Sequence, residues 1–218
     1  MLRYYHYRKL SSVSQEAYKK IVAAIKRFSL CAVIDRVENL QVVVNAVKND
    51  NPHLFYVNWY SYRAEYQGAK IIIYFQYHMG RGETLAVWRN AKATAPSLRG
   101  STDYQSIKNV HDYIAKNTRY DKAVTDKNGF RMNDHTMIGP LFEGLGVCEG
   151  ISRAAQFLLR ELRVECTYQN GYVNENGARG YHAWNLVRVN GETLKMDVTW
   201  DLADRNGRVS YRYFCVKP

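Results

Sequence analysis

The clearest pattern in the chain is a helical repeat of apolar residues after Cys148. The apolar positions recur at intervals of three and four residues and comprise Ile151, Ala154, Ala155, Leu158, Leu159 and Leu162. This spacing places all six side chains on one face of a helix. The repeat therefore predicts a helix that begins close to Cys148.

A second strong pattern is a pair of alternating segments joined by Asn190-Gly191. Asn-Gly in this setting favours a two-residue hairpin turn, which predicts that Val189 faces Glu192. In this register one face is mainly apolar and comprises Ala183, Val187, Val189, Leu194, Met196 and Val198. The other face carries His182, Trp184, Leu186, Lys195, Asp197 and Thr199. His182 and Asp197 become diagonal neighbours, so their side chains are expected to meet.

The first ninety residues predict a small unit of helices and strands. A helix capped by Ser14 is indicated by Tyr18, Ile21, Val22, Ile25 and Phe28. A second helix is predicted from about Asp35, although its valines also fit a strand. Segments 54–65 and 69–79 predict a hairpin that turns near Gln67-Gly68. His53 and His78 are isolated and are interpreted as packed or exposed imidazoles.

The middle of the chain predicts a boundary between two parts. Residues 91–100 contain Pro96, Ser97 and Gly100 and predict a linker. Thr102 and Gln105 have the spacing of a capping box, which predicts a helix that follows them. Residues 121–140 are rich in polar residues and predict a loop. We therefore expect an α+β protein with a small α+β region at 1–95 and a second domain at 96–218.

Composition narrows the classes of protein that fit the sequence. The 218 residues are 46% hydrophobic, which is typical of globular chains, and they carry a formal net charge of +11. Such an excess favours anionic partners, among them a cell-surface polymer, although a basic surface also serves solubility. The basic residues form no long run, and no RNA-binding motif is present, so nucleic acid is disfavoured. The first ten residues lack the apolar segment of a signal peptide, which leaves two compartments open: exported for a mature fragment, cytoplasmic for a native start.

Cys148 is the candidate for nucleophilic chemistry among four cysteines, none of which shares the spacing of a zinc site. Unpaired N–H groups and the dipole at a helix N-terminus stabilise a thiolate, which is the reactive form of cysteine. His182 could then carry the proton while Asp197 orients the imidazole. The alternatives are a buried structural cysteine and an ordinary cross-strand polar pair. The three residues together predict a catalytic triad.

Three short segments resemble the transglutaminase-like superfamily of papain-like cysteine enzymes, in its bacterial form. They are Gly146-Val147-Cys148-Glu149-Gly150, His182-Ala183-Trp184-Asn185 and Asp197-Val198-Thr199-Trp200-Asp201. The upstream His111-Asp112-Tyr113-Ile114 and Tyr120-Asp121 resemble the helix before this core, so the resemblance covers about 101–216. It implies a papain-like core in which the nucleophile helix packs on an antiparallel sheet. It also implies thioester chemistry on protein or peptide amides, as transglutaminase, deamidase or protease, without a cofactor or catalytic metal.

The sequence leaves several alternatives open. Animal transglutaminases use an upstream aromatic side chain at the oxyanion, but no Trp lies between Trp88 and Trp184, so only the Cys148 N–H is named as a donor. Glu149 is expected to oppose thiolate formation, and Gly146 and Gly150 are expected to leave room for a substrate. The acyl acceptor is either water or an amine. The rival function is a non-catalytic module that binds a protein or cell-wall ligand.

Overall fold

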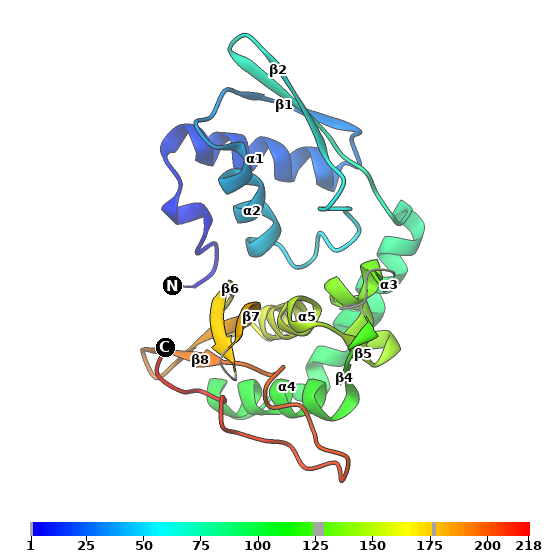
Figure 1. Ribbon diagram of the computed structural model, residues 1–218, viewed down its shortest axis with the longest axis vertical. Helices are drawn as coiled ribbons and strands as arrows, with labels where there is room; N and C mark the ends of the chain where they lie inside the picture. Colours follow the sequence, from blue (N-terminus) through cyan, green and yellow to red (C-terminus); the bar gives the residue numbers. More distant parts are fainter. Residues whose placement is uncertain (1, 124–128, 176–177) are drawn as a thin grey trace. The chain divides into compact units, whose positions relative to one another are not determined.

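The computed structural model describes residues 2–123, 129–175 and 178–218, and the chain separates into two compact units (Figure 1). The first unit is Tyr4–Trp88, and the second is Arg89–Pro218 together with Met1–Arg3. This division falls inside a helix, a few residues before the predicted division between 95 and 96. We describe each unit by itself.

The first unit combines helices with a three-stranded antiparallel sheet. Its elements are η1 (Tyr7–Lys9), α1 (Ser12–Lys26), β1 (Cys31–Asp35), α2 (Leu40–Asp50), β2 (Arg63–Gln67) and β3 (Lys70–Tyr74), with strand order β1-β3-β2. The predicted hairpin turn is confirmed, since β2 pairs with β3 across a turn in which Gly68 has a left-handed φ of 56°. The predicted strand bounds are wrong, because β2 covers only the end of 54–65 and β3 only the first part of 69–79. The predicted cap at Ser14 is wrong, because the Ser11 hydroxyl accepts the hydrogen bond from the Ser14 N–H. Asp35 ends a strand, and the second helix starts only at Leu40.

The predicted linker at 91–100 is mostly helical. Helix α3 runs over Arg81–Thr94, and a 3-10 helix, η2, follows over Ala95–Leu98 with Pro96 in its first turn. Proline fits this position because an N–H in the first turn of a helix has no helical acceptor, so proline loses no hydrogen bond there. The alanines at 91, 93 and 95 have a high helix propensity, and they outweigh the turn-forming Pro96, Ser97 and Gly100 from which the linker was predicted.

In the second unit, η2 is followed by helix α4 (Asp103–Asn117). Its predicted cap is confirmed, since the Thr102 hydroxyl accepts a hydrogen bond from the Gln105 N–H. Strand β4 (Arg119–Tyr120) pairs in parallel with β5 (Leu145–Gly146). The predicted loop at 121–140 contains η4 (Met132–His135), and the π-helix η5 (Gly139–Glu143) begins at its end. Residues 124–128 of that prediction lie outside the described residues. Helix α5 (Cys148–Glu161) completes the helical part.

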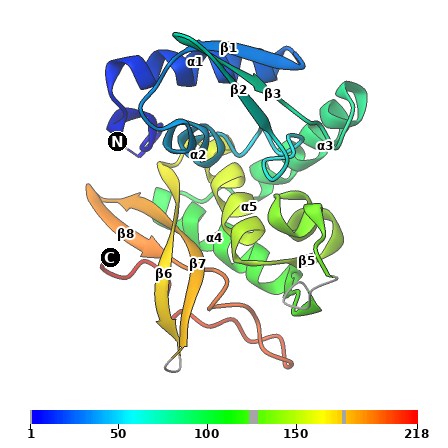
Figure 2. The same ribbon diagram turned by 45° about the horizontal axis from the view of Figure 1, so that its top comes forward.

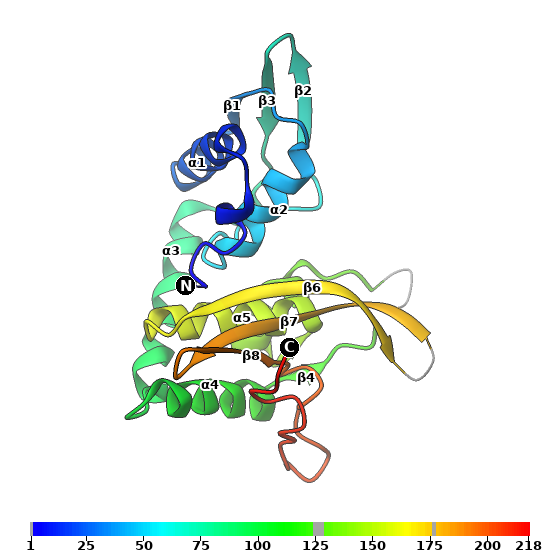
Figure 3. The same cartoon turned by 90° about the vertical axis from the view of Figure 1, so that its left-hand side faces the viewer.

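The sheet of the second unit is antiparallel, with strand order β6-β7-β8. Its strands are β6 (Cys166–Glu175), β7 (Ala178–Val189) and β8 (Glu192–Met196). Figures 2 and 3 show the strands beside α5, which packs against β6 and β7 and also contacts α4. This arrangement confirms the predicted fold, a nucleophile helix packed on an antiparallel sheet. The apolar repeat forms its core, because the six repeat residues from Ile151 to Leu162 are all buried.

The predicted hairpin register is confirmed. Val189 faces Glu192 and Asn185 faces Met196, as the Asn190-Gly191 turn requires. Within the described residues, no helix combines the length and apolar character needed to cross a membrane.

Candidate functional site

Cys148 is the first residue of α5, as predicted. The preceding Val147 has an extended backbone and offers no side-chain cap to the first turn. Backbone N–H groups at a helix start lack helical partners, and together with the helix dipole they favour an anion nearby. The local backbone therefore presents the thiol where a thiolate is stabilised.

The two glycines beside Cys148 serve packing. A Cβ atom added to Gly150 would lie 2.2 Å from the carbonyl oxygen of Asp134, and one added to Gly146 would lie 2.8 Å from the ring of Pro140. The space beside both residues is thus filled by the protein itself. The expectation that they leave room for a substrate is wrong.

His182 and Asp197 are in direct contact, as the hairpin register predicted. His182 lies on β7, and Asp197 is the first residue after β8. The imidazole Nε2 is 2.8 Å from Asp197 Oδ2, and the Asp197 side chain is fully buried. The Trp200 N–H donates to the other carboxylate oxygen at 3.4 Å. A buried carboxylate with these partners holds the imidazole in one orientation.

Cys148 also interacts with the His182 ring. Burial lowers the pKa of His182, but hydrogen bonds to Asp197 and Cys148 outweigh burial and raise the pKa to about 9. The Cys148 side chain itself is only half-buried. The structure therefore gathers all three predicted residues: a thiol at a helix start, an imidazole that favours its charged form, and a buried carboxylate.

A family comparison matches this same region. The family described as the transglutaminase-like superfamily matches residues 92–200, which include Cys148, His182 and Asp197. This chain belongs to the transglutaminase-like superfamily. Membership supports cysteine-based enzyme chemistry in general. A comparison with curated proteins finds no match.

Solved structures with similar folds include a TGase and two bacterial proteins. The TGase structure has 15% identity and a TM-score of 0.47, with 83% of this chain and 52% of that chain covered. A candidate cysteine protease from Cytophaga hutchinsonii has 13% identity and a TM-score of 0.41 over 68% and 64% of the chains. A candidate protease from Parabacteroides distasonis has 11% identity and a TM-score of 0.40 over 62% and 35%. This transglutaminase-like chain spans about half the length of the TGase structure.

An aromatic wall supports the imidazole in this transglutaminase-like site. The Trp200 ring stacks on the His182 ring with centroids 4.3 Å apart and an interplanar angle of 8°. Trp184 also stacks on His182, at 6.2 Å, and Tyr213 packs against Trp200 at 4.8 Å. Sequence patterning placed Trp184 on the correct face, but it could not identify Trp200 or Tyr213 as supports, since they lie outside the hairpin strands.

Glu149 is neutralised by neighbours that the sequence analysis missed. Two guanidinium nitrogens of Arg153, Nε and Nη2, each lie 3.0 Å from Glu149 Oε1. His135 Nδ1 lies 3.3 Å from the other oxygen, and the guanidinium of Arg153 stacks over the Tyr168 ring. The expected opposition of Glu149 to a thiolate is therefore offset by a buried positive charge. The spacing of four residues between Glu149 and Arg153 was an available signal, whereas nothing in the sequence indicated His135.

A second histidine–aspartate cluster anchors the C-terminal segment. The buried His111 ring lies 3.1 Å from Asp112 Oδ1 and 3.3 Å from Asp201 Oδ2. Asp201 accepts hydrogen bonds from the Tyr213 N–H, and the Tyr213 carbonyl accepts from the Asp197 N–H. Asp201 thus orients His111 directly and supports the backbone at Asp197 through Tyr213. The Asp201 carboxylate is fully used by His111 and the Tyr213 N–H.

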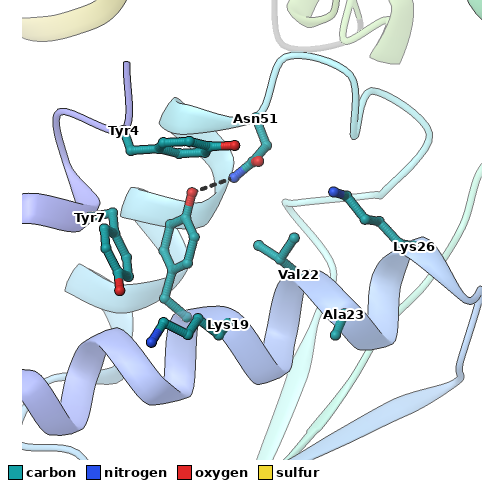
Figure 4. Close-up of a pocket in the computed structure, with 8 residues that line it drawn as sticks. Tyr4, Tyr7, Lys19, Val22, Ala23, Lys26 and Asn51 are labelled. Atoms are coloured by element: carbon teal, nitrogen blue, oxygen red, sulfur yellow. Dashed lines mark hydrogen bonds between the residues drawn. The ribbon is translucent and has the colours of Figure 1, made fainter. Parts of the chain in front are cut away.

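No group of three or more His, Cys, Asp and Glu side chains in the described ranges is placed to hold a metal ion. The first unit contains a separate cavity of about 350 Å³. Figure 4 shows Tyr4 and Tyr7 on one side of it and Val22 and Lys26 on the other. Asn51 donates a hydrogen bond of 2.7 Å to the hydroxyl of Tyr18, which also lines the cavity. None of the predicted triad residues lines this cavity.

Proposed function

We propose that this transglutaminase-like chain carries out cysteine-dependent acyl chemistry on protein or peptide amides. Cys148 is the nucleophile, His182 transfers protons and Asp197 orients His182. The observation that carries the proposal is the 2.8 Å contact of His182 Nε2 with the buried Asp197, beside a cysteine at a helix start. Because Nε2 is engaged with Asp197, Nδ1 is the nitrogen that exchanges a proton with the thiol. The catalytic residues all lie in the proposed domain 96–218.

The proposed reaction has two halves. In the first, the thiolate attacks the amide carbonyl carbon, and the backbone N–H of Cys148 stabilises the oxyanion. The C–N bond then breaks as His182 gives its proton to the departing amine or ammonia, which leaves a thioester on Cys148. In the second half, water or an acceptor amine attacks the thioester while His182 removes its proton, and the C–S bond breaks to release the Cys148 thiolate beside the recharged His182. Water gives hydrolysis or deamidation, and an amine gives transamidation.

The proposed partners follow from this chemistry and from charge. A protein or peptide amide is the acyl donor, with an amine as an optional acceptor. The net charge of +11 favours binding to an anionic cell-surface polymer, near which the substrate would lie. The rival function, a non-catalytic binding module, predicts the same fold without turnover.

Selective alkylation tests the identity of the nucleophile. At about pH 6, iodoacetamide is expected to modify Cys148 before the other cysteines, since among the described residues it alone lies at a helix start beside an imidazole. Burial raises the pKa of Cys166 to about 12 and that of Cys215 to about 11, which keeps both as thiols. Peptide mapping by mass spectrometry measures the order of labelling. Equal labelling of the four cysteines in the folded protein would contradict the assignment.

A paired assay tests the reaction itself. A glutamine-bearing protein is incubated with the chain and a labelled amine, while ammonia release, peptide cleavage and amine incorporation are followed together. Ammonia release alone indicates deamidation, incorporation indicates transamidation, and new termini indicate proteolysis. The Cys148→Ala variant is expected to lose each activity, while the matched Cys31→Ala variant keeps it. If the unmodified protein bound such substrates and turned none over, the binding module would be the correct function.

A further inference from the structure

Lys195 occupies an unusual position next to the proposed triad. It lies on β8, two residues before Asp197, and only 17% of its side chain is exposed. Its ammonium nitrogen is 4.8 Å from the centre of a Trp184 ring, 4.7 Å from that of Trp200 and 5.9 Å from that of Tyr213. Aromatic faces stabilise a cation at such distances. The same aromatic wall that supports the imidazole therefore also holds a fixed positive charge.

This charge contacts the same carboxylate oxygen that holds His182. Lys195 Nζ lies 3.4 Å from Asp197 Oδ2, the oxygen that is 2.8 Å from His182 Nε2. The ammonium is therefore no more than about 6 Å from the imidazole nitrogen. At this separation, in a mostly buried setting, two positive charges repel appreciably. A single oxygen of Asp197 thus stabilises two competing cations.

The other charged and titratable groups around this pair are few among the described contacts. Helix α5 contributes the Cys148 thiol, which favours a charged imidazole. The C-terminal segment contributes the Tyr213 phenol, with Arg212 stacked against that ring at 5.6 Å. Asp197 supplies the negative charge. Of these groups, Lys195 is the cation in direct contact with the orienting carboxylate.

We infer that Lys195 is a positioning residue that holds Asp197 in place and weakens the stabilisation of the His182 imidazolium. If Asp197 paired with His182 alone, without Lys195, the imidazolium would be more strongly stabilised. It would then hold its proton too firmly to give it to a departing amine. By sharing Asp197 Oδ2, Lys195 keeps His182 a competent acid while the carboxylate still orients the ring. This catalytic consequence rests on the proposed function. The electrostatic effect on His182 does not depend on turnover.

Two variants separate the charge of Lys195 from its packing, and a third serves as a control. Lys195→Met removes the charge and keeps most of the apolar stem, while Lys195→Arg retains the charge. The matched control is Lys108→Met, because Lys108 also pairs with an aspartate bound to a histidine, Asp112, and also lies over a tyrosine ring, at 4.6 Å. The thermal midpoint of each variant measures its effect on folding.

The readouts are an NMR titration of the His182 ring and the pH profile of kcat/KM. Lys195→Met is expected to raise the pKa of His182 by about half to one pH unit and to shift the alkaline limb of the kcat/KM profile upward by the same amount. It is also expected to lower kcat about threefold to tenfold near neutral pH with little change in KM, because proton donation slows. Lys195→Arg is expected to restore both values, and Lys108→Met to leave them unchanged.

An unchanged His182 titration in folded Lys195→Met would overturn the inference. An equal shift in Lys195→Arg would also overturn it, since packing rather than charge would then be responsible. If Lys195→Met fails to fold, Lys195→Gln is titrated in its place, with the same expected shift. A protein that shows the shift but turns over no amide would contradict the proposed function and support the electrostatic role of Lys195.

Discussion

Replacing Asp197 with asparagine is expected to lower kcat roughly 100- to 10,000-fold while the protein stays folded. The amide can donate a hydrogen to His182 Nε2, which places the imidazole proton on the wrong nitrogen for exchange with Cys148. The neutral side chain also removes the stabilisation of the imidazolium that Asp197 provides. Steady-state kinetics with the substrate of the paired assay measures the loss, and circular dichroism checks the fold.

The matched control for this variant is Asp112→Asn. Asp112 contacts His111 at 3.1 Å and Lys108 at 2.6 Å, so it is a second aspartate shared by a histidine and a lysine. No described contact joins it to Cys148 or His182, and its replacement is expected to change kcat less than twofold. Activity within about twofold of the unmodified protein in Asp197→Asn would show that Asp197 has only a structural role.

Exchanging neighbouring residues, Met196→Asp with Asp197→Met, is expected to abolish activity and to destabilise the protein by several kcal/mol. Successive residues of a strand point to opposite faces, so the exchange moves the carboxylate from His182 to the apolar face of the hairpin. Met196 is fully buried there and lies across from Asn185. A carboxylate in that position is fully buried on the apolar face, and His182 loses its partner.

Urea unfolding and turnover measure the two effects of the exchange. The control exchange, Glu192→Thr with Thr193→Glu, lies in the same strand near the turn, where Glu192 is exposed. We expect it to keep both stability and activity. A stable and active Met196–Asp197 exchange would require another carboxylate to orient His182. Asp201 is poorly placed for that role, because it is committed to His111 and to the Tyr213 N–H.

The helix and the hairpin that carry the site could be predicted from patterns within short segments of the sequence. The repeat of apolar residues determined that α5 begins at Cys148, since all six side chains are buried on one face. Two-residue Asn-Gly turns allow essentially one register, so the contact between His182 and Asp197 was predictable from residues 181–200 alone. The prediction of a linker at 91–100 is wrong because it rests on Pro96, Ser97 and Gly100, whereas the alanines at 91, 93 and 95 favour the helices that form there.

The fold class, the start of the nucleophile helix and the contact between His182 and Asp197 could therefore all be predicted from the sequence. The helix start depends on a repeat within one segment, and the His182–Asp197 contact, 15 residues apart in the chain, depends on the register that the Asn190-Gly191 turn imposes. The surroundings of these residues depend on contacts between distant parts of the folded chain. His135 meets Glu149, and the Trp200 ring stacks on His182, through side chains that packing brings together. No local pattern in the sequence encodes these two contacts, whereas the Glu149–Arg153 pair, four residues apart on one helix, is locally encoded.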